Sequence, residues 1–279
     1  MTFPKLAMPL ATLLFAATWA CFAVEPAAKP GAEPAAEPAA KPTTESAKEP
    51  GVMLHEGMEF SGAGSYEVPS ALQGVAPSAW PGDGWFRLVV GTDHVDVAPV
   101  AAPQGRLPAF LIPVVAQAAS EQSSMPVDVP LPQLTEDQIT AIYLRVPDAA
   151  LHAGKVPSYI FKNGTSHLLP KLDYRYELTF NGRPLAFTVQ NGLRGKNGAP
   201  YGEGAHYRIE YDGQTYDYDV RGFGWASMIE AITDLDGDGK PDFILSIEGN
   251  NSSVEAILLS SKAKPGKNPP TASLLANGC

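Results

Sequence analysis

The sequence contains very little cysteine, which limits its covalent cross-links. Its 279 residues include two cysteines, Cys21 and Cys279. Because Cys21 lies in a segment that we expect to be cleaved off, the mature chain would keep a single thiol and could form no intramolecular disulfide. A terminal residue is seldom held in a fixed geometry. We therefore expect Cys279 to be an exposed thiol without chemistry, with pairing between molecules as the alternative.

Positive charge is also scarce. The chain has 20 Lys and Arg residues against 30 Asp and Glu residues, and its formal net charge is −10. A protein that binds nucleic acid must neutralise phosphates with Lys and Arg side chains, so this excess of acidic residues argues against nucleic acid as a partner. An acidic surface instead favours solubility and the binding of cations.

Sequence patterns typical of catalysis are missing. The histidines are scattered, without the spacing of a transition-metal site; they are His55, His94, His152, His167 and His206. No G-x-S-x-G elbow, P-loop or dinucleotide-binding fingerprint occurs. The carboxylates offer no pairing that marks an acid and a base. We therefore assign no catalytic residues and favour a non-enzymatic role over an enzymatic one.

The first 23 residues have the features of an export signal. Lys5 is the only charged residue before Glu25, and the segment from Leu6 to Ala23 is apolar, as in a signal peptide that is cleaved after Ala23. One alternative is lipid attachment at Cys21. Another is an uncleaved anchor, since about 18 apolar residues nearly suffice to span a bilayer. We expect an extracytoplasmic protein that is periplasmic or secreted. If a lipid is attached at Cys21, the protein would be anchored to the envelope.

Residues 24–52 form a low-complexity segment. They repeat Ala, Pro, Glu and Lys and contain almost no large apolar side chain. Such a segment buries too little apolar surface to offset the entropy lost on ordering, and its prolines favour an extended polyproline II conformation. We therefore expect a disordered linker between the N-terminus and the folded part.

The remaining residues, 53–279, are rich in Gly, Pro, Tyr and Val and show few helical periods. This composition predicts a mainly β fold of antiparallel sheets, sandwich-like or meander-like, with few short helices. The many prolines in residues 98–133 argue against a central strand there. We therefore expect an N-terminal β-rich part at 53–133 and a C-terminal β-rich part at 134–279. Thr135 and Gln138 have the spacing of a capping box, which predicts one short helix.

Three predicted hairpins support this fold class. They span residues 85–97, 176–189 and 207–220. The second and third contain Asn181-Gly182 and Asp212-Gly213, dipeptides that favour type I′ turns. Pro184 predicts that the returning strand of the second hairpin begins late or lies at a sheet edge. The tyrosines of the third hairpin form a ladder that we expect to pack across strands rather than to serve as a sugar-binding platform.

The most informative segment is an acidic loop at residues 234–242. Its carboxylates are those of Asp234, Asp236, Asp238 and Asp242. Ca²⁺ takes six to eight oxygen ligands, and alternate residues of a tightly curled loop point toward one centre. Gly239 permits the turn, after which the backbone carbonyl of Lys240 can add an oxygen. Four carboxylates this close repel one another without a cation. The loop therefore predicts a Ca²⁺ site, because Mg²⁺ demands a more rigid octahedral geometry.

The flanks of this loop differ from those of an EF-hand. Position 12 is Leu245 rather than Glu, and both flanks are β-rich rather than helical. Residues 225–260 resemble a repeat of the FG-GAP or VCBS type, with its Asp-x-Asp-Gly-Asp-Gly-x-x-Asp loop between strands. The resemblance implies the same calcium ligands, including the Lys240 carbonyl. A full β-propeller is not expected, because no second acidic loop supplies another blade.

Together, the export signal, the linker and the calcium loop predict a binding or interaction module with a structural calcium ion. Its partner would be a protein or a glycan. One alternative is a hydrolase of an envelope polymer, which requires a cleft with two carboxylates about 5 to 10 Å apart. The other is a purely structural envelope component, which requires an exposed apolar patch or a free sheet edge.

Overall fold

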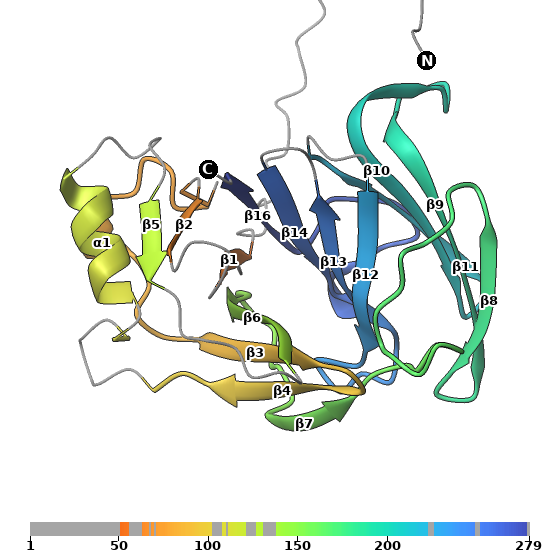
Figure 1. Ribbon diagram of the computed structural model, residues 1–279, viewed down its shortest axis with the longest axis horizontal. Helices are drawn as coiled ribbons and strands as arrows, with labels where there is room; N and C mark the ends of the chain where they lie inside the picture. The colour runs from red at the N-terminus through yellow and green to blue at the C-terminus, as the bar shows by residue number, and fades with distance from the viewer. Residues whose placement is uncertain are drawn as a thin grey trace, which may run out of the picture. The chain divides into compact units, whose positions relative to one another are not determined.

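Figure 1 presents the computed structural model of the chain, which describes residues 51–55, 63–66, 68–69, 71–101, 108–109, 111–120, 127–130, 138–222, 226–248 and 252–277. The predicted signal peptide, both cysteines and all but the last two residues of the predicted linker lie outside the described residues. Residues Ala47–Cys279 form one compact unit. In the described part of the chain, no helix is long and apolar enough to cross a membrane.

The described residues form three β-sheets (Figure 1). Sheet A has the strand order β1 (Val52–His55), β6 (Gln138–Arg145), β3 (Trp85–Gly91), β4 (His94–Pro99) and β7 (Gly154–Pro157). Sheet B has the order β12 (Ala226–Thr233), β13 (Asp242–Glu248), β14 (Ser252–Leu258), β16 (Ala272–Asn277), β2 (Ala63–Tyr66) and β5 (Val127–Pro130). Sheet C has the order β15 (Gly266–Asn268), β11 (Gln214–Val220), β10 (Pro200–Tyr211), β9 (Arg183–Arg194) and β8 (Arg175–Phe180). The helical elements are α1 (Leu111–Ser120) and the 3-10 turns η1 (Pro77–Ala79) and η2 (Ser260–Lys262).

The predicted fold class is confirmed. Strands make up about 54% of the described residues, and the helical elements are few and short. Neighbouring strands run antiparallel, apart from the parallel pair β11 and β15. None of the three sheets closes into a propeller, in agreement with the prediction from the single acidic loop.

Sheet B lies between two hydrophobic cores. Ile244 of β13 belongs to a core shared with sheet A. Its neighbours Phe243 and Leu245 belong to a second core shared with sheet C. Because successive side chains of a strand point to opposite faces, β13 is buried on both faces. This explains why its residues Phe243–Leu245 are all apolar. This arrangement places the β12–β13 connection, the acidic loop, at one end of the central layer.

Local turn chemistry explains the two clearest hairpins. Asn181 and Gly182 have φ values of 47° and 76°, and Asp212 and Gly213 have φ values of 52° and 72°, as a type I′ turn requires. In the third hairpin, Tyr207 pairs with Tyr218. Both side chains are buried, so the tyrosine ladder packs inside the fold as predicted.

The prediction for Pro184 was wrong. Strand β9 begins at Arg183 and lies between β8 and β10. The last β10 pairing is Tyr211 with Leu185, so Pro184 lies beyond the end of the ladder on that side. Its missing N–H therefore removes no hydrogen bond from the sheet.

The helix of residues 98–145 lies elsewhere than predicted. Gln138, the expected capping residue of a helix, instead begins strand β6, while Thr135 lies outside the described residues. The helix of this region is α1, at Leu111–Ser120. Strand β6 pairs with both β1 and β3, and β2 and β5 extend sheet B. The sheets therefore mix strands from both sides of the boundary predicted near residue 133.

Candidate metal centre

The acidic loop connects β12 to β13, with Thr233 and Asp242 as the last cross-strand pair before it. The loop curls tightly because two of its glycines have left-handed backbones, with φ of 73° at Gly237 and 83° at Gly239. Residues other than Gly rarely adopt such φ values. The predicted turn at Gly239 is therefore present, and Gly237 contributes a second one.

Three of the four predicted carboxylates converge. Asp234, Asp236 and Asp242 each offer an oxygen, and these oxygens lie within 4.8 Å of one another. Asp238 is not a member of this trio. Its Oδ1 accepts a hydrogen bond from the backbone N–H of Lys240 at 2.9 Å, and its Oδ2 lies 3.6 Å from the Lys240 ammonium. Ligation by Asp238 and by the Lys240 carbonyl stays a prediction from the spacing.

Asp242 is the most deeply buried carboxylate of the cluster. Its side chain is 0% exposed. Its Oδ2 accepts the backbone N–H of Leu235 at 2.8 Å, and its Oδ1 accepts the backbone N–H of Ser260 at 2.8 Å. Burial, with the nearby charge of Asp236, raises the pKa of Asp242 well above its ordinary range. A neighbouring cation would compensate the charge that burial disfavours.

Asp234 gives the clearest sign that the cluster can bind a cation. Its Oδ2 accepts the backbone N–H of Gly239 at 2.9 Å. Its Oδ1 is buried and has no hydrogen-bond partner among the described residues. Burial also raises the pKa of Asp234. Buried acceptors are normally satisfied, so this oxygen fits a cation ligand, and the all-oxygen donor set suits a hard ion such as Ca²⁺.

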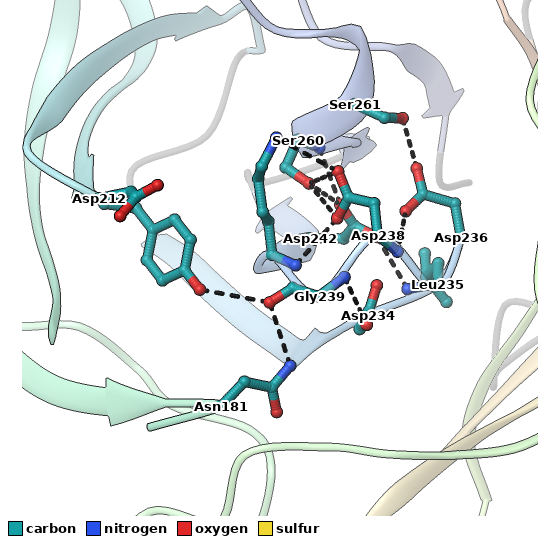
Figure 2. A network of polar contacts seen from close by, with 12 residues as sticks. Asn181, Asp212, Asp234, Leu235, Asp236, Asp238, Gly239, Asp242, Ser260 and Ser261 are labelled. Atoms are coloured by element: carbon teal, nitrogen blue, oxygen red, sulfur yellow. Dashed lines mark hydrogen bonds and ion pairs between the residues drawn. The ribbon is translucent and has the colours of Figure 1, made fainter. Parts of the chain in front are cut away.

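Residues far away in the sequence support the loop (Figure 2). On one side, the Ser260 hydroxyl donates to Asp242 at 3.0 Å and to Asp238 at 3.3 Å, and the Ser261 hydroxyl donates to Asp236. Both serines belong to η2. No spacing rule links them to the aspartates, so sequence reasoning missed them.

The opposite side of the loop contacts sheet C. The Gly239 carbonyl accepts hydrogen bonds from the Asn181 side chain and from the Tyr211 hydroxyl, each at 3.2 Å. Asn181 lies in the β8–β9 turn and Tyr211 ends β10. The backbone N–H of His152 also donates to the Leu235 carbonyl at 2.6 Å. The loop is thus attached to segments that are distant in the sequence.

A second feature is an open groove of about 800 Å³ on sheet C, lined by residues of β8, β9 and the β10–β11 hairpin. Glu177 and Glu210 both line it, and both accept hydrogen bonds from Arg175, at 3.1 Å and 2.8 Å. The hydrogen bond from Arg175 lowers the pKa of Glu210. Sequence reasoning did not single out these three residues, because strand pairing is needed to bring Glu210 beside Arg175 and Glu177.

Comparisons with known proteins add no family to this description. A scan against protein-family models and searches of curated proteins and solved structures found no match. The likeness of residues 225–260 to FG-GAP or VCBS repeats therefore rests on the loop sequence alone.

Proposed function

We propose that this protein is an exported, β-rich interaction module whose acidic loop binds one structural Ca²⁺ ion. Asp234, Asp236 and Asp242 would hold the ion, with Asp238 and the Lys240 carbonyl completing its shell as the sequence predicts. The observation that carries this proposal is the buried Asp234 oxygen without a hydrogen-bond partner, beside two further carboxylates within 4.8 Å. The partner of the module would be a protein or a glycan.

A structural role for the ion follows from the contacts of the loop. Its carboxylates accept hydrogen bonds from η2, and its Gly239 carbonyl accepts hydrogen bonds from two residues of sheet C. The Leu235 side chain is fully buried in the core shared with sheet A. An ion that neutralises the aspartates would therefore stabilise a junction of several segments.

The hydrolase alternative receives less support. A glycoside hydrolase needs one carboxyl group kept protonated as a general acid, which requires a raised pKa. Glu177 and Glu210 share a groove, but both bond to Arg175, and the pKa of Glu210 is lowered rather than raised. A purely structural envelope role is also less favoured, because Arg175 and Glu177 place charges on the edge strand β8, a device that discourages strand pairing.

Calorimetric titration of Ca²⁺ into the chelator-treated mature protein tests the proposal, with thermal unfolding in parallel. We expect binding near 1:1 and, at free Ca²⁺ of 100 times Kd, stabilisation by about 2.7 kcal/mol. Asp236→Ala and Asp238→Ala should weaken binding, and Mg²⁺ should compete poorly. Asp83→Ala, which removes an exposed acid outside the loop, is the matched control. Absence of both binding heat and a thermal shift in the unmodified protein would overturn the proposal.

A further inference from the structure

We propose that the groove on sheet C binds a chain of an uncharged glycan, and that the acidic loop holds the end of β10, at Tyr211, in position beside this groove. The second part of this statement rests on the calcium binding proposed above. The groove is open and about 800 Å³ in volume, so an internal segment of a polymer can lie in it without threading an end. The class of ligand follows from charge, strand direction and the side chains that remain free to contact it.

The charged side chains of the groove all take part in ion pairs, one of them with Arg183 beside the groove. Arg175 bonds to Glu177 and to both carboxylate oxygens of Glu210. Asp212, at the hairpin, lies 3.0 Å from Arg183. An anionic or cationic ligand would have to separate these pairs or bind beside a charge of its own sign. A neutral ligand leaves the pairs intact, and the paired carboxylates keep lone pairs that can accept its hydroxyl groups.

The direction of the groove argues against an added peptide strand. Its lining comes from β8, β9, β10 and β11 and therefore crosses the strands instead of following one of them. The backbones of β9 and β10 are already paired with strands on both sides. Peptide binding by strand addition uses free backbone groups of a sheet edge. Strand β8 is an edge of sheet C, but Arg175 and Glu177 place charges on it, a device that discourages strand pairing. A ligand that crosses the strands therefore meets mainly side chains.

The remaining side chains suit a polyhydroxylated chain. Thr179, Gln214 and Thr215 are exposed and offer hydroxyl and amide groups that both donate and accept hydrogen bonds. The rings of Tyr159 and Pro184 add apolar surface. Binding sites for small organic groups commonly combine such apolar surface with a few polar groups that fix orientation.

The calcium loop contacts the groove through one shared residue. Tyr211 lines the groove, and its hydroxyl donates to the Gly239 carbonyl of the loop at 3.2 Å. Asn181, in the turn next to the groove, donates to the same carbonyl. A cation that orders the loop would therefore also order the end of β10 that borders the groove, and glycan affinity should depend on Ca²⁺.

Calorimetry with a panel of soluble hexasaccharides tests the proposal. The uncharged probes are hexamers of β-linked glucose, mannose and N-acetylglucosamine; the charged probe is hexagalacturonate, and an extended hexapeptide represents proteins. We expect at least one uncharged hexamer to bind the calcium-loaded mature protein and the charged probe and peptide not to bind. Binding by none of the uncharged hexamers, or a preference for either of the other probes, overturns the proposal.

Two groove variants locate the binding. Gln214→Ala combined with Thr215→Ala, and separately Thr179→Trp, should each weaken glycan binding at least tenfold, because one removes polar contacts and the other fills the groove at an exposed strand position. Glu203→Ala, at an exposed β10 position outside the groove, is the control. Each variant is first compared with the unmodified protein in thermal unfolding and Ca²⁺ titration, which separates loss of the groove from loss of the fold or of the loop.

Glycan titrations repeated in chelator separate the proposed groove from the proposed calcium site. Glycan binding that weakens severalfold after calcium removal supports the coupling. Equal glycan affinity with and without Ca²⁺, in a protein that binds Ca²⁺, overturns the coupling. The assignment of the groove as the glycan site then stands. Glycan binding by a protein that takes up no Ca²⁺ overturns the proposed calcium site and again leaves the groove assigned.

Discussion

The Tyr211 hydroxyl donates a hydrogen bond to the Gly239 carbonyl across 3.2 Å and so joins the last residue of β10 to the turn of the acidic loop. Tyr211 belongs to sheet C and borders its groove. Gly239 lies in the acidic loop that connects two strands of sheet B. The bond therefore provides a direct test of how strongly the loop and sheet C depend on one another.

Replacement of Tyr211 by Phe removes this bond while keeping the ring. We expect the free energy of unfolding to fall by about 1 kcal/mol, the usual net value of one hydrogen bond, because the Asn181 side chain still serves the Gly239 carbonyl. Denaturant unfolding measures the change. Tyr201→Phe is the control, since Tyr201 is 51% exposed; an equal loss in both variants would contradict a specific role for the Tyr211 hydroxyl.

Replacement of Asp242 by Asn should destabilise the protein even in chelator. Both carboxylate oxygens of Asp242 accept backbone N–H groups, and an amide has one oxygen, so one N–H would face the amide NH₂. We expect the free energy of unfolding to fall by about 1–3 kcal/mol, the cost of an unsatisfied buried polar group.

The matched variant is Asp236→Asn, at a less buried position of the same trio. Its expected effect in chelator is within about 0.5 kcal/mol, as for most surface substitutions, although both variants should weaken Ca²⁺ binding. Chemical denaturation with and without Ca²⁺ gives the four values. Similar stability of the two variants in chelator would refute the structural role assigned to Asp242.

Replacement of Ser260 by Ala tests support of the loop from η2. The hydroxyl that orients Asp242 and Asp238 is lost, while the backbone N–H of residue 260 still donates to Asp242. Removal of groups that orient metal ligands typically costs 10–100-fold in affinity, so we expect the Kd for Ca²⁺ to rise about tenfold. Ser273→Ala, at an exposed position of β16, should leave the Kd unchanged; no difference between these variants would remove Ser260 from the site.

Replacement of Gly204 by Ala tests the irregular part of β10. Gly204 has φ of 115°, and a Cβ atom there would lie 2.4 Å from the Val220 carbonyl oxygen. We expect a loss of more than about 2 kcal/mol in the free energy of unfolding, because unusual backbone strain and a steric clash act together. Gly198→Ala is the control: φ is 76°, with open space around the added atom, so the strain of the left-handed backbone, about 1 kcal/mol, acts alone. Thermal or denaturant unfolding compares them, and a smaller loss at Gly204 than at Gly198 would contradict this account.

Features set by neighbouring residues could be predicted from the sequence. Asn181-Gly182 and Asp212-Gly213 specify their turns because their backbones tolerate positive φ at little cost. Alternating apolar residues specify the strands on either side. The Asp spacing of the acidic loop likewise predicted a cluster, and Asp234, Asp236 and Asp242 do converge.

Tertiary structure decided the features that depend on distant partners. Gln138 carries a local helix-cap signal, but β6 gains hydrogen bonds from β1 and β3 and buries Ile142 and Leu144, which outweighs a weak local preference. Pro184 fits the inner strand β9 only because the pairing of β9 with β10 ends at Leu185, so that β10 offers no partner for an N–H at residue 184.

The sequence by itself therefore determined a mainly β chain with its tight turns and an acidic loop, because these features arise from backbone preferences acting over a few residues. Only the tertiary structure decided that Ser260 would orient Asp242, that Tyr211 would join the loop to sheet C, and that Arg175 would pair with Glu210. Those contacts form when strands pair within a sheet and when the sheets pack through their shared cores, and both depend on the whole chain.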